Sequence, residues 1–363
     1  MKFLRDFQVK GKRVLVRCDF NVPLSEKGEI LDDFRIKETI PTIEYLIKKR
    51  AKVILMSHLG KPKGKVVENL KLDKIQERLM EYLDLSIVKA PDCIGKEIEN
   101  WVKKMAEGEI LLLENLRFHK EEEENEENFA RELAKLGDIY INDAFASCHR
   151  AHASIVGIPK FLPSGAGLLL EKEIKFLNKI IKNPKKPLVS IFGGDDPDFK
   201  AIEEISKIAD FILIGGLIEN LIREKDIKLK FPEKIIKPVD DIEGKDIGPE
   251  TIKIFKEKIL SAKTIFWSGP LGKIEDEKFQ KGTKEIAKAI IESGAFSVIG
   301  GGETIEFINK LGWVEKFSHV STGGSALLFY LAGEKLPGIA ALNFLRNYEK
   351  STKIRKIFCN EKH

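Results

Sequence analysis

Short apolar runs rich in Val, Ile and Leu recur along the chain, and each ends at a glycine or a polar residue. Amphipathic segments, such as 36–49 and 126–136, separate the runs and carry apolar residues at helical spacing. Nearly continuous apolar runs are typical of strands buried on both faces of a parallel sheet. The pattern therefore predicts repeated βαβ units and an α/β fold in both halves. The predicted strands are 12–20, 51–58, 109–116 and 137–145 in the first half, and 187–194, 209–216, 263–270, 296–302 and 317–324 in the second.

The segment 157–187 lies between the two predicted sheets. Pro and Gly residues precede a long amphipathic helix there, and a Pro-flanked turn follows it, which predicts a connecting helix with hinges at its ends. We therefore expect two Rossmann-like lobes, each a parallel sheet flanked by helices, joined by this hinge helix. The predicted boundaries are 1–165 for the first lobe, 166–186 for the helix, 187–343 for the second lobe and 344–363 for a tail that packs back on the first lobe.

Composition narrows the class of protein. At 363 residues, with 43% hydrophobic and 33% charged residues, the chain is too long for one ordinary core and too apolar for disorder. The 62 basic and 57 acidic side chains leave a net charge of only +5, spread through every segment, which argues against a nucleic-acid binder. Four cysteines lie far apart without metal-ligand spacing, and no stretch approaches the ~20 apolar residues of a membrane helix. We expect a cytoplasmic protein that binds neither nucleic acid nor membrane.

The residues at the ends of the predicted strands differ between the halves, and open α/β sheets place their ligand sites at these ends. First-half strand ends carry cations and hydrogen-bonding side chains, and Arg35 joins them from the segment that opens a helix. This set predicts a site for a small anion. Its members are Arg17, Asp19, Asn21, His58, Lys61, Arg117, His149 and Arg150.

Glycine dominates the second-half strand ends. Glycine lets backbone N–H groups approach a phosphate or a flat base, with the N-terminus of the next helix aimed at the anion. An isolated glycine pair is as often a plain turn, but five groups at successive strand ends favour a nucleotide site. These groups are 193–194, 215–216, Gly269, 300–302 and 323–324.

Ten segments, in the same order, resemble the phosphoglycerate kinase family, from about residue 9 to about residue 342. Each segment is weak alone, and their shared order carries the resemblance. They are RVLVRCDFNVPL (13–24), DDFRIKETIPTI (32–43), MSHLGKP (56–62), LLENLRF (112–118), NDAFASCHRAHAS (142–154), WSGPLGKIE (267–275), FQKGT (279–283), GGGET (300–304), STGG (321–324) and GEKLPGIAAL (333–342).

The resemblance implies reversible transfer of a phosphoryl group between 1,3-bisphosphoglycerate and ADP, giving 3-phosphoglycerate and ATP. A carboxylate acceptor is already ionised at pH 7, so this reaction needs positioning and charge neutralisation rather than a general base. The family usually has arginine at the position of Lys61. Lysine keeps the positive charge but lacks the planar guanidinium that binds a phosphate through two N–H groups, so we expect a lower affinity for the phosphoglycerate. The resemblance also implies that Arg35 both binds the acceptor and stabilises the phosphoryl group during its transfer. The residues implied to bind 3-phosphoglycerate are Asp19, Asn21, Arg35, His58, Lys61, Arg117 and Arg150.

The nucleotide side departs from the family's pattern. The family's GGAKVxDK is GGDDPDFK here, which puts Asp196 at the first lysine and Lys200 at the second. A carboxylate there reverses the local field, and the loss of one stabilising contact costs ~10²–10³ in rate. The family's GGGMA is GGLIE, so Leu217 projects where glycine leaves room for adenine. Glu303 stands where the family has its metal-linked aspartate. Its side chain is one methylene longer, so it must adopt a different position to bind the implied Mg²⁺.

Other positions of the family are retained. The resemblance implies catalytic roles for Arg35, Lys200 and Gly324, a metal ligand at Glu303, and a monomer whose lobes close about the hinge helix. The residues implied to bind ATP or ADP are Gly193, Gly194, Lys200, Gly216, Glu275, Gly302, Glu303 and Thr304.

Three interpretations stay open. The first is an active kinase with rearranged donor binding, in which Lys273 compensates for the lost lysine. The second is a catalytically impaired relative that binds phosphoglycerate as a sensor or interaction module, motivated by Asp196, Leu217 and Glu303. The third is a kinase with a different donor or acceptor.

Two acidic segments also have purely structural explanations. In DDPDFK an aspartate can cap the start of a helix. The run 121–127 is predicted to be a solvated acidic helix start.

Overall fold

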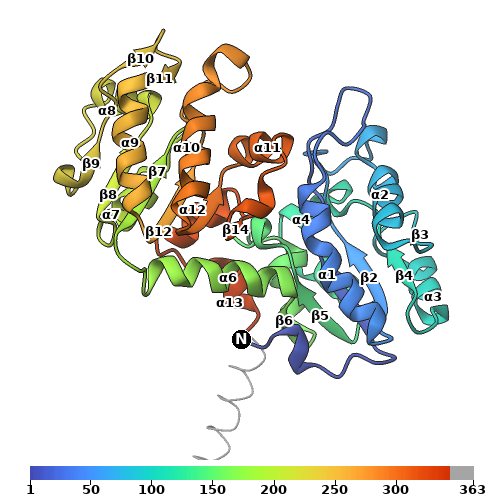
Figure 1. Ribbon diagram of the computed structural model, residues 1–363. Coiled ribbons are helices and arrows are strands. Elements are labelled where there is room, and N and C mark those ends of the chain that lie inside the picture. Colours follow the sequence, from blue (N-terminus) through green and yellow to red (C-terminus); the bar gives the residue numbers. More distant parts are fainter. Residues whose placement is uncertain (344–363) are drawn as a thin grey trace, which may run out of the picture. The chain divides into compact units, whose positions relative to one another are not determined.

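A computed structural model describes residues 1–343, which form two compact units (Figure 1). Unit 1 comprises Met1–Lys172 and the segment from Lys335, and unit 2 comprises Glu173–Glu334. The division falls inside helix α6 (Leu168–Ile181) and not at the predicted ends of a separate connecting segment. The predicted tail, 344–363, lies outside the described residues.

The last described helix, α13 (Pro337–Ala341), belongs to unit 1 and not to the second lobe predicted from the sequence. The N–H of Gly338 donates to the carbonyl of Cys148 at 2.9 Å. A Cβ at Gly338 would lie 2.9 Å from the Cα of Cys148, so glycine permits this close approach. A backbone contact between distant segments leaves no periodic signal in the sequence, which explains the wrong boundary.

Unit 1 is built on six parallel strands in the order β3-β4-β2-β1-β5-β6. The four strands predicted in the first half are confirmed as β1, β2, β4 and β5. Strands β3 and β6 were missed because they are edge strands of two and three residues. The strands are β1 (Arg13–Arg17), β2 (Lys52–Met56), β3 (Val88–Lys89), β4 (Ile110–Leu112), β5 (Ile139–Asn142) and β6 (Ser164–Ala166).

Helices flank this sheet (Figure 1). In α1 the apolar residues Ile36, Ile40, Ile43 and Leu46 recur every three or four positions, and all four are buried in the core of unit 1. The helices of unit 1 are α1 (Phe34–Lys48), α2 (Asp73–Leu83), α3 (Lys96–Lys104), α4 (Lys120–Glu123), α5 (Glu127–Lys135) and α13.

Unit 2 repeats the plan with six parallel strands in the order β14-β13-β12-β7-β8-β9. All five strands predicted in the second half are confirmed. The strands are β7 (Leu188–Phe192), β8 (Phe211–Ile214), β9 (Ile235–Ile236), β12 (Thr264–Ser268), β13 (Phe296–Gly300) and β14 (His319–Val320), with a separate antiparallel pair, β10 (Asp241–Ile242) and β11 (Asp246–Ile247).

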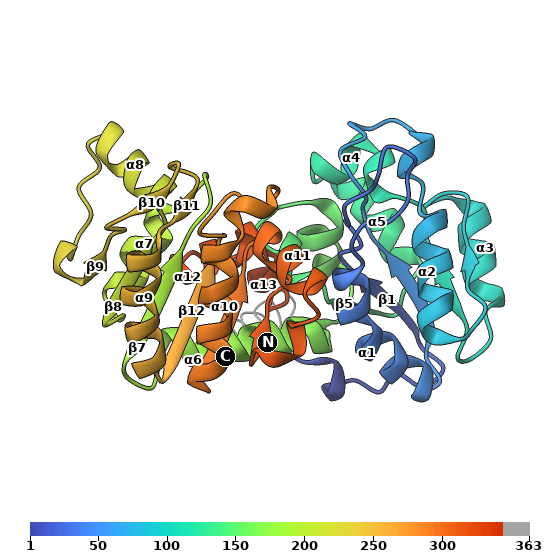
Figure 2. The same ribbon diagram turned by 45° about the horizontal axis from the view of Figure 1, so that its top comes forward.

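Helices also flank the sheet of unit 2, and α9 and α10 lie side by side in both views (Figure 2). Within residues 1–343, no helix combines the length and apolar character that crossing a bilayer requires. The helices of unit 2 are α7 (Phe199–Ser206), α8 (Gly216–Glu224), α9 (Pro249–Ser261), α10 (Lys281–Ser293), α11 (Gly302–Lys310) and α12 (Ser325–Leu331).

Each sheet contains a point where the strand order reverses. In unit 1 the chain runs from β1 outward through β2 and returns to β5 on the other side of β1. In unit 2 it runs from β7 outward through β8 and returns to β12 on the other side of β7. Open α/β sheets bind ligands beyond the carboxyl ends of strands at such switch points. The topology thus selects the ends of β1 and β5 in unit 1 and the ends of β7 and β12 in unit 2.

Candidate active site: an anion site and a glycine-lined pocket

Asp19 lies just beyond β1, at the switch point of unit 1, and is only 5% exposed. Its carboxylate accepts a hydrogen bond from Ser147 Oγ at 2.9 Å and pairs with Arg35 Nη1 at 3.2 Å. The same Nη1 donates to the carbonyl of Asn21 at 3.2 Å. Burial raises the pKa of Asp19, but the surrounding cations, Arg35 first, lower it further, so the pKa lies below its usual range. The ionised carboxylate therefore holds the Arg35 guanidinium in place.

Arg117 brings a second guanidinium to this site from the turn Leu116–Phe118 beyond β4, and it is only 2% exposed. Its Nη1 donates to the carbonyl of Gly60 at 2.8 Å, while the N–H of Gly60 donates to Asn21 Oδ1 at 2.8 Å. Among the described residues, nothing accepts a hydrogen bond from the buried Arg117 Nη2. A buried charged donor without an acceptor is costly, so this atom indicates an anionic ligand.

His58 follows β2 and is buried beside Arg17. Arg17 Nη2 lies 3.1 Å from His58 Nδ1, and a guanidinium can only donate, so Nδ1 is the acceptor and the ring proton sits on Nε2. Burial lowers the pKa of His58 well below its usual value, and Arg17, Arg117 and Arg150 lower it as well, against the opposing effect of Asp19. His58 is therefore a neutral hydrogen-bond donor near pH 7.

The two remaining residues predicted to bind the acceptor lie at different depths. Arg150 is half-buried, and its positive charge lowers the pKa of both His58 and Arg117, which places it in the same cluster. Lys61 is exposed, next to Gly60. The structure thus brings together six of the seven residues predicted to bind the acceptor, with Lys61 at the surface beside them.

Glu122 is a buried member of this region that the sequence analysis missed. The acidic run 121–127 was predicted to be solvated, and at Glu122 this prediction is wrong, because the side chain is fully buried. Its carboxylate accepts hydrogen bonds from Ser154 N at 2.8 Å and Ser154 Oγ at 2.6 Å, and Ser154 Oγ also accepts from Arg17 Nε at 2.8 Å. Glu122 lies on the four-residue helix α4 and its partner Ser154 is 32 positions away, so no periodicity in the sequence marks this glutamate.

His152 makes the stability of unit 1 dependent on pH. Burial, with Arg117, Arg17 and Arg150, lowers the pKa of His152 to about 3. The unfolded side chain, with a pKa of about 6.5, takes up a proton as the pH falls, whereas the folded one does not. Between pH 7 and pH 5 this difference lowers the free energy of unfolding by about 2 kcal/mol. Urea unfolding at both pH values should show that His152→Gln loses this part of the pH dependence; an unchanged dependence contradicts the assignment.

The switch point of unit 2 holds a pocket of ≈ 300 Å³, lined by the loops that follow β7, β12 and β13 and by the start of α12. Two of these loops touch through their backbones. Gly193 N donates to the carbonyl of Ser268 at 2.9 Å, and Gly194 N donates to the carbonyl of Pro270 at 2.8 Å. A Cβ at Gly193 would lie 2.0 Å from the carbonyl oxygen of Pro270, so no other residue fits there. Predicted residues Gly302, Glu303 and Gly324 also line the pocket.

Carboxylates surround this pocket. Asp195, Asp196 and Glu303 line it, and the described residues that line it include no cation. Burial raises the pKa of Glu303, and the negative charges of Glu275 and Asp195 raise it further. Carboxylate oxygens are the ligands that Mg²⁺ prefers, so this donor set fits the implied metal. Of these carboxylates, Glu303 and Asp195 could hold such an ion.

In the segment DDPDFK, the first two aspartates line the pocket and the third caps a helix. Asp198 Oδ1 accepts a hydrogen bond from Ala201 N at 2.9 Å at the start of α7, so the predicted aspartate cap is confirmed at this position. Lys200 is exposed and pairs with Glu334 at 2.6 Å, and it does not line the pocket. Lys273 is also exposed and outside the lining, so it does not replace the missing lysine there.

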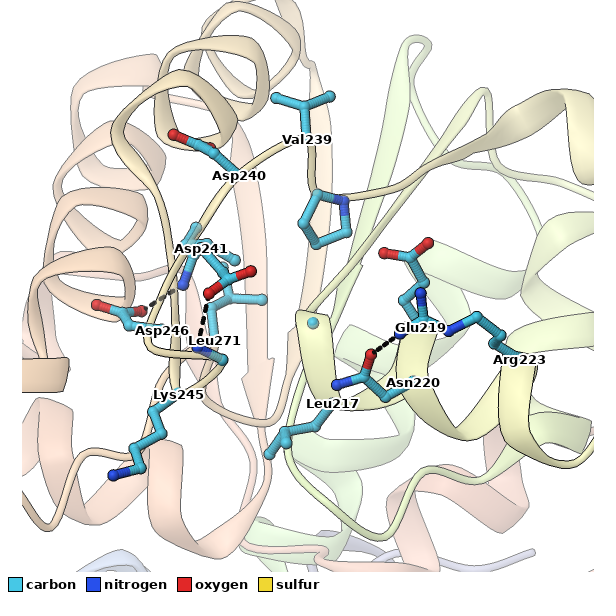
Figure 3. Close-up of a pocket in the computed structure, with 14 residues that line it drawn as sticks. Leu217, Glu219, Asn220, Arg223, Val239, Asp240, Asp241, Lys245, Asp246 and Leu271 are labelled. Carbon is cyan, nitrogen blue, oxygen red and sulfur yellow. Dashed lines mark hydrogen bonds between the residues drawn. The ribbon is translucent and has the colours of Figure 1, made fainter.

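A second pocket, of ≈ 160 Å³, lies beside Gly216 at the start of α8 (Figure 3). Leu217 lines it and is 41% exposed. The opposite wall is the β10–β11 pair, where burial raises the pKa of Asp246 to about 6. Two predicted nucleotide residues remain. Glu275 is exposed outside both linings, and its charge raises the pKa of Glu303. Thr304 is buried, and its Oγ1 has no hydrogen-bond partner among the described residues.

Comparisons with known proteins all lead to the same family. The model of a family described as phosphoglycerate kinase matches residues 4–230 and 223–334. Among curated proteins, the phosphoglycerate kinase of Dictyoglomus turgidum is 44% identical over 387 residues, covering 93% of this chain and 97% of that protein. The phosphoglycerate kinase of Pelotomaculum thermopropionicum is 42% identical over 388 residues, covering 94% and 98%.

Solved structures agree with these sequence matches. The crystal structure of phosphoglycerate kinase from Pyrococcus horikoshii OT3 matches with a TM-score of 0.86 and 34% identity, covering 96% of this chain and 100% of that one. The structure of phosphoglycerate kinase from Coxiella burnetii matches with a TM-score of 0.78 and 30% identity, covering 94% and 98%.

Proposed function

The chain belongs to the phosphoglycerate kinase family, and from this premise we propose how its two sites divide the family's reaction. The chain is a phosphotransferase that moves a phosphoryl group reversibly between 1,3-bisphosphoglycerate and ADP, giving 3-phosphoglycerate and ATP. Nothing in the fold or the comparisons favours the impaired relative considered above. The roles of individual residues are our proposal.

The anion site of unit 1 binds the phosphoglycerate. The observation that carries this assignment is the buried Arg117, whose Nη2 has no protein acceptor among the described residues. His58 adds a neutral N–H donor, and Arg150 adds a further positive charge. Arg35, fixed by Asp19, offers its remaining N–H groups to the phosphoryl oxygens during transfer. Because the acceptor carboxylate is already ionised, no general base is required.

The glycine-lined pocket of unit 2 binds the phosphates of ATP or ADP. The N–H groups of Gly193 and Gly194 are bonded to the Ser268 and Pro270 carbonyls, so the phosphate donors are the backbone N–H groups of Gly302 and Gly324 at the starts of α11 and α12. Glu303 with Asp195 would hold Mg²⁺. When bound, Mg²⁺ neutralises phosphate charge in a pocket that this chain lines with carboxylates. Lys200 contributes to transfer after leaving Glu334, and an exposed ion pair of this kind contributes little to stability, so it opens readily.

We propose that the protein works in glycolysis as a cytoplasmic monomer on small-molecule substrates. Cys18, Cys93 and Cys148 are buried free thiols, which supports a reducing compartment. No nucleic-acid or membrane partner is needed for a reaction between two soluble metabolites.

Calorimetry with each ligand separately tests the proposal. We expect 3-phosphoglycerate and MgADP each to bind at one site per chain. Binding of 3-phosphoglycerate alone, without MgADP, would support the impaired relative and overturn the proposed nucleotide site.

Removing the charge of Asp196 should tighten nucleotide binding. Asp196 is exposed at the edge of the pocket, so solvent screens its repulsion of the phosphates, and we expect Asp196→Asn to lower the Kd for MgADP on the order of fivefold. The same calorimetric titration checks this. Glu257→Gln, an exposed acid on α9 outside the pocket, should leave the Kd unchanged. An equal effect of both variants contradicts a specific role for Asp196.

A further inference from the structure

Three potential metal ligands meet at the carboxyl ends of β3 and β4 in unit 1. Asp92 and Cys93 lie in the bend that follows β3, and His119 follows the turn Leu116–Phe118 beyond β4. Their ligand atoms, one from each side chain, all lie within 4.8 Å of one another. Residues 1–343 hold no second group of three such ligands. Cys93 and His119 are 26 positions apart, which is why the cysteine spacing gave no signal for a metal site.

The geometry of the cluster leaves one side open. His119 Nε2 lies 2.7 Å from Asp92 Oδ1, and that same oxygen accepts the N–H of Cys93 at 2.6 Å. Cys93 is fully buried, whereas the side chains of Asp92 and His119 are 48% and 27% exposed. The thiol therefore forms the floor, and solvent reaches the cluster from the carboxylate side. Phe129 packs against the His119 ring, with ring centroids 5.3 Å apart, and limits its orientation.

We propose that Asp92, Cys93 and His119 bind a transition-metal ion of the Zn²⁺ class, with water as the fourth ligand. Thiolate and imidazole ligands select Zn²⁺ over the hard ions Mg²⁺ and Ca²⁺. Three protein ligands and one open position form a common tetrahedral zinc arrangement. Zinc bonds of about 2.0–2.3 Å place tetrahedral ligand atoms roughly 3.3–3.6 Å apart. The Asp92–His119 pair therefore opens slightly, and the thiol moves inward.

Binding exchanges protons for the metal. The Cys93 thiol releases its proton to solvent. The proton between His119 Nε2 and Asp92 leaves that nitrogen, going to solvent from a protonated ring or to Nδ1 in a neutral one, and the ion takes the place of both protons. No electron is transferred. The site is distinct from the Mg²⁺ position proposed at Glu303, because it lies in unit 1 and has a sulfur ligand.

A bound ion would join two loops of unit 1 that carry different tasks. Strand β3 is a two-residue edge strand, and the bend after it holds Asp92 and Cys93. His119 is two residues from Arg117, whose guanidinium lines the anion site. The ion therefore stabilises the sheet edge and fixes the turn that carries Arg117. A ligand that binds only the folded state raises stability in proportion to the logarithm of its concentration.

Co²⁺ and Zn²⁺ titrations of the metal-free full-length chain test the proposal. Co²⁺ should bind one per chain and give the near-ultraviolet charge-transfer band of a cobalt–thiolate bond, together with the visible bands of tetrahedral cobalt. Zn²⁺ should displace the Co²⁺ and raise the thermal unfolding midpoint. If no thiolate band develops at one equivalent of Co²⁺, the proposal is wrong.

Variants assign the signal to the cluster. Cys93→Ser should abolish the thiolate band, and His119→Gln should weaken Zn²⁺ binding by at least ~10–100-fold. Cys359→Ser, which removes a thiol outside the described residues, is the matched control and should keep both. A thiolate band that survives Cys93→Ser, or that disappears in Cys359→Ser, overturns the proposal. If Cys93→Ser does not fold, His119→Gln decides the question, because that ring is partly exposed.

Discussion

Replacing Arg35 with alanine is expected to lower kcat for phosphoryl transfer by about 10²–10³-fold, the usual loss when one preorganised donor to a transition state is removed. Arg35 lies in the first turn of α1, and its contacts with the Asp19 carboxylate and the Asn21 carbonyl both use Nη1. These contacts fix the guanidinium and leave Nε and Nη2 for phosphoryl oxygens. Because the expected contact forms during transfer, the loss should fall on kcat more than on the KM for phosphoglycerate.

Steady-state kinetics of three variants separate this role from a general charge effect. Arg35→Lys keeps the positive charge without the planar fork, and we expect an intermediate kcat. Arg131→Ala removes an exposed arginine of α5 that pairs with Glu127, and its kcat should match that of the original chain. The role assigned to Arg35 is refuted if Arg35→Ala stays within tenfold of the control while both proteins are folded by circular dichroism.

Replacing Glu173 with alanine should lower the free energy of unfolding of unit 2 by about 3–5 kcal/mol, because it leaves three buried donors, on His319 and Thr322, without their acceptor. Glu173 on α6 and His319 on β14 are both fully buried, and Glu173 Oε2 lies 2.8 Å from His319 Nε2. Glu173 Oε1 accepts hydrogen bonds from Thr322 N at 2.6 Å and Thr322 Oγ1 at 2.9 Å. Burial raises the pKa of Glu173, but His319 and these hydrogen bonds lower it more, so the carboxylate is ionised at pH 7.

Denaturant unfolding at pH 7 measures this effect. Glu171→Ala is the matched control on the same helix, because Glu171 pairs with Arg5 at the surface and such pairs contribute only about 0–1 kcal/mol. A loss for Glu173→Ala no larger than that for Glu171→Ala contradicts the structural role of the pair. Because Thr322 leads directly into Gly324, we also expect Glu173→Ala to weaken MgADP binding.

The sequence predicted the interior of both sheets well and their edges poorly. Interior strands such as β7 and β12 are mostly apolar runs buried on both faces, so composition alone marks them. The edge strand β3 is two residues long, and Val88 in it is exposed, so no apolar run distinguishes it from a loop.

In the candidate sites, too, the sequence predicted the residues at strand ends but not the contacts that only the folded chain creates. Strand-end reasoning selected Asp19 and Arg117, because parallel strands deliver their ends to one edge of the sheet. Sequence reasoning did not find Glu122, whose partner Ser154 reaches it only through the folded chain. Nor did it anticipate that Lys200 would pair with Glu334 instead of lining the pocket, because the direction of an exposed lysine depends here on a residue 134 positions away in sequence.

The measurement that tests the central claim most directly is a coupled assay of the purified chain with MgATP and 3-phosphoglycerate, run beside Asp196→Lys. The account predicts turnover by the original chain that requires both substrates, because the anion site is complete and Mg²⁺ offsets the carboxylates of the glycine-lined pocket. If the unmodified chain shows no turnover and Asp196→Lys does, that result would contradict the proposed kinase activity. It would show that Asp196 makes the nucleotide site inactive.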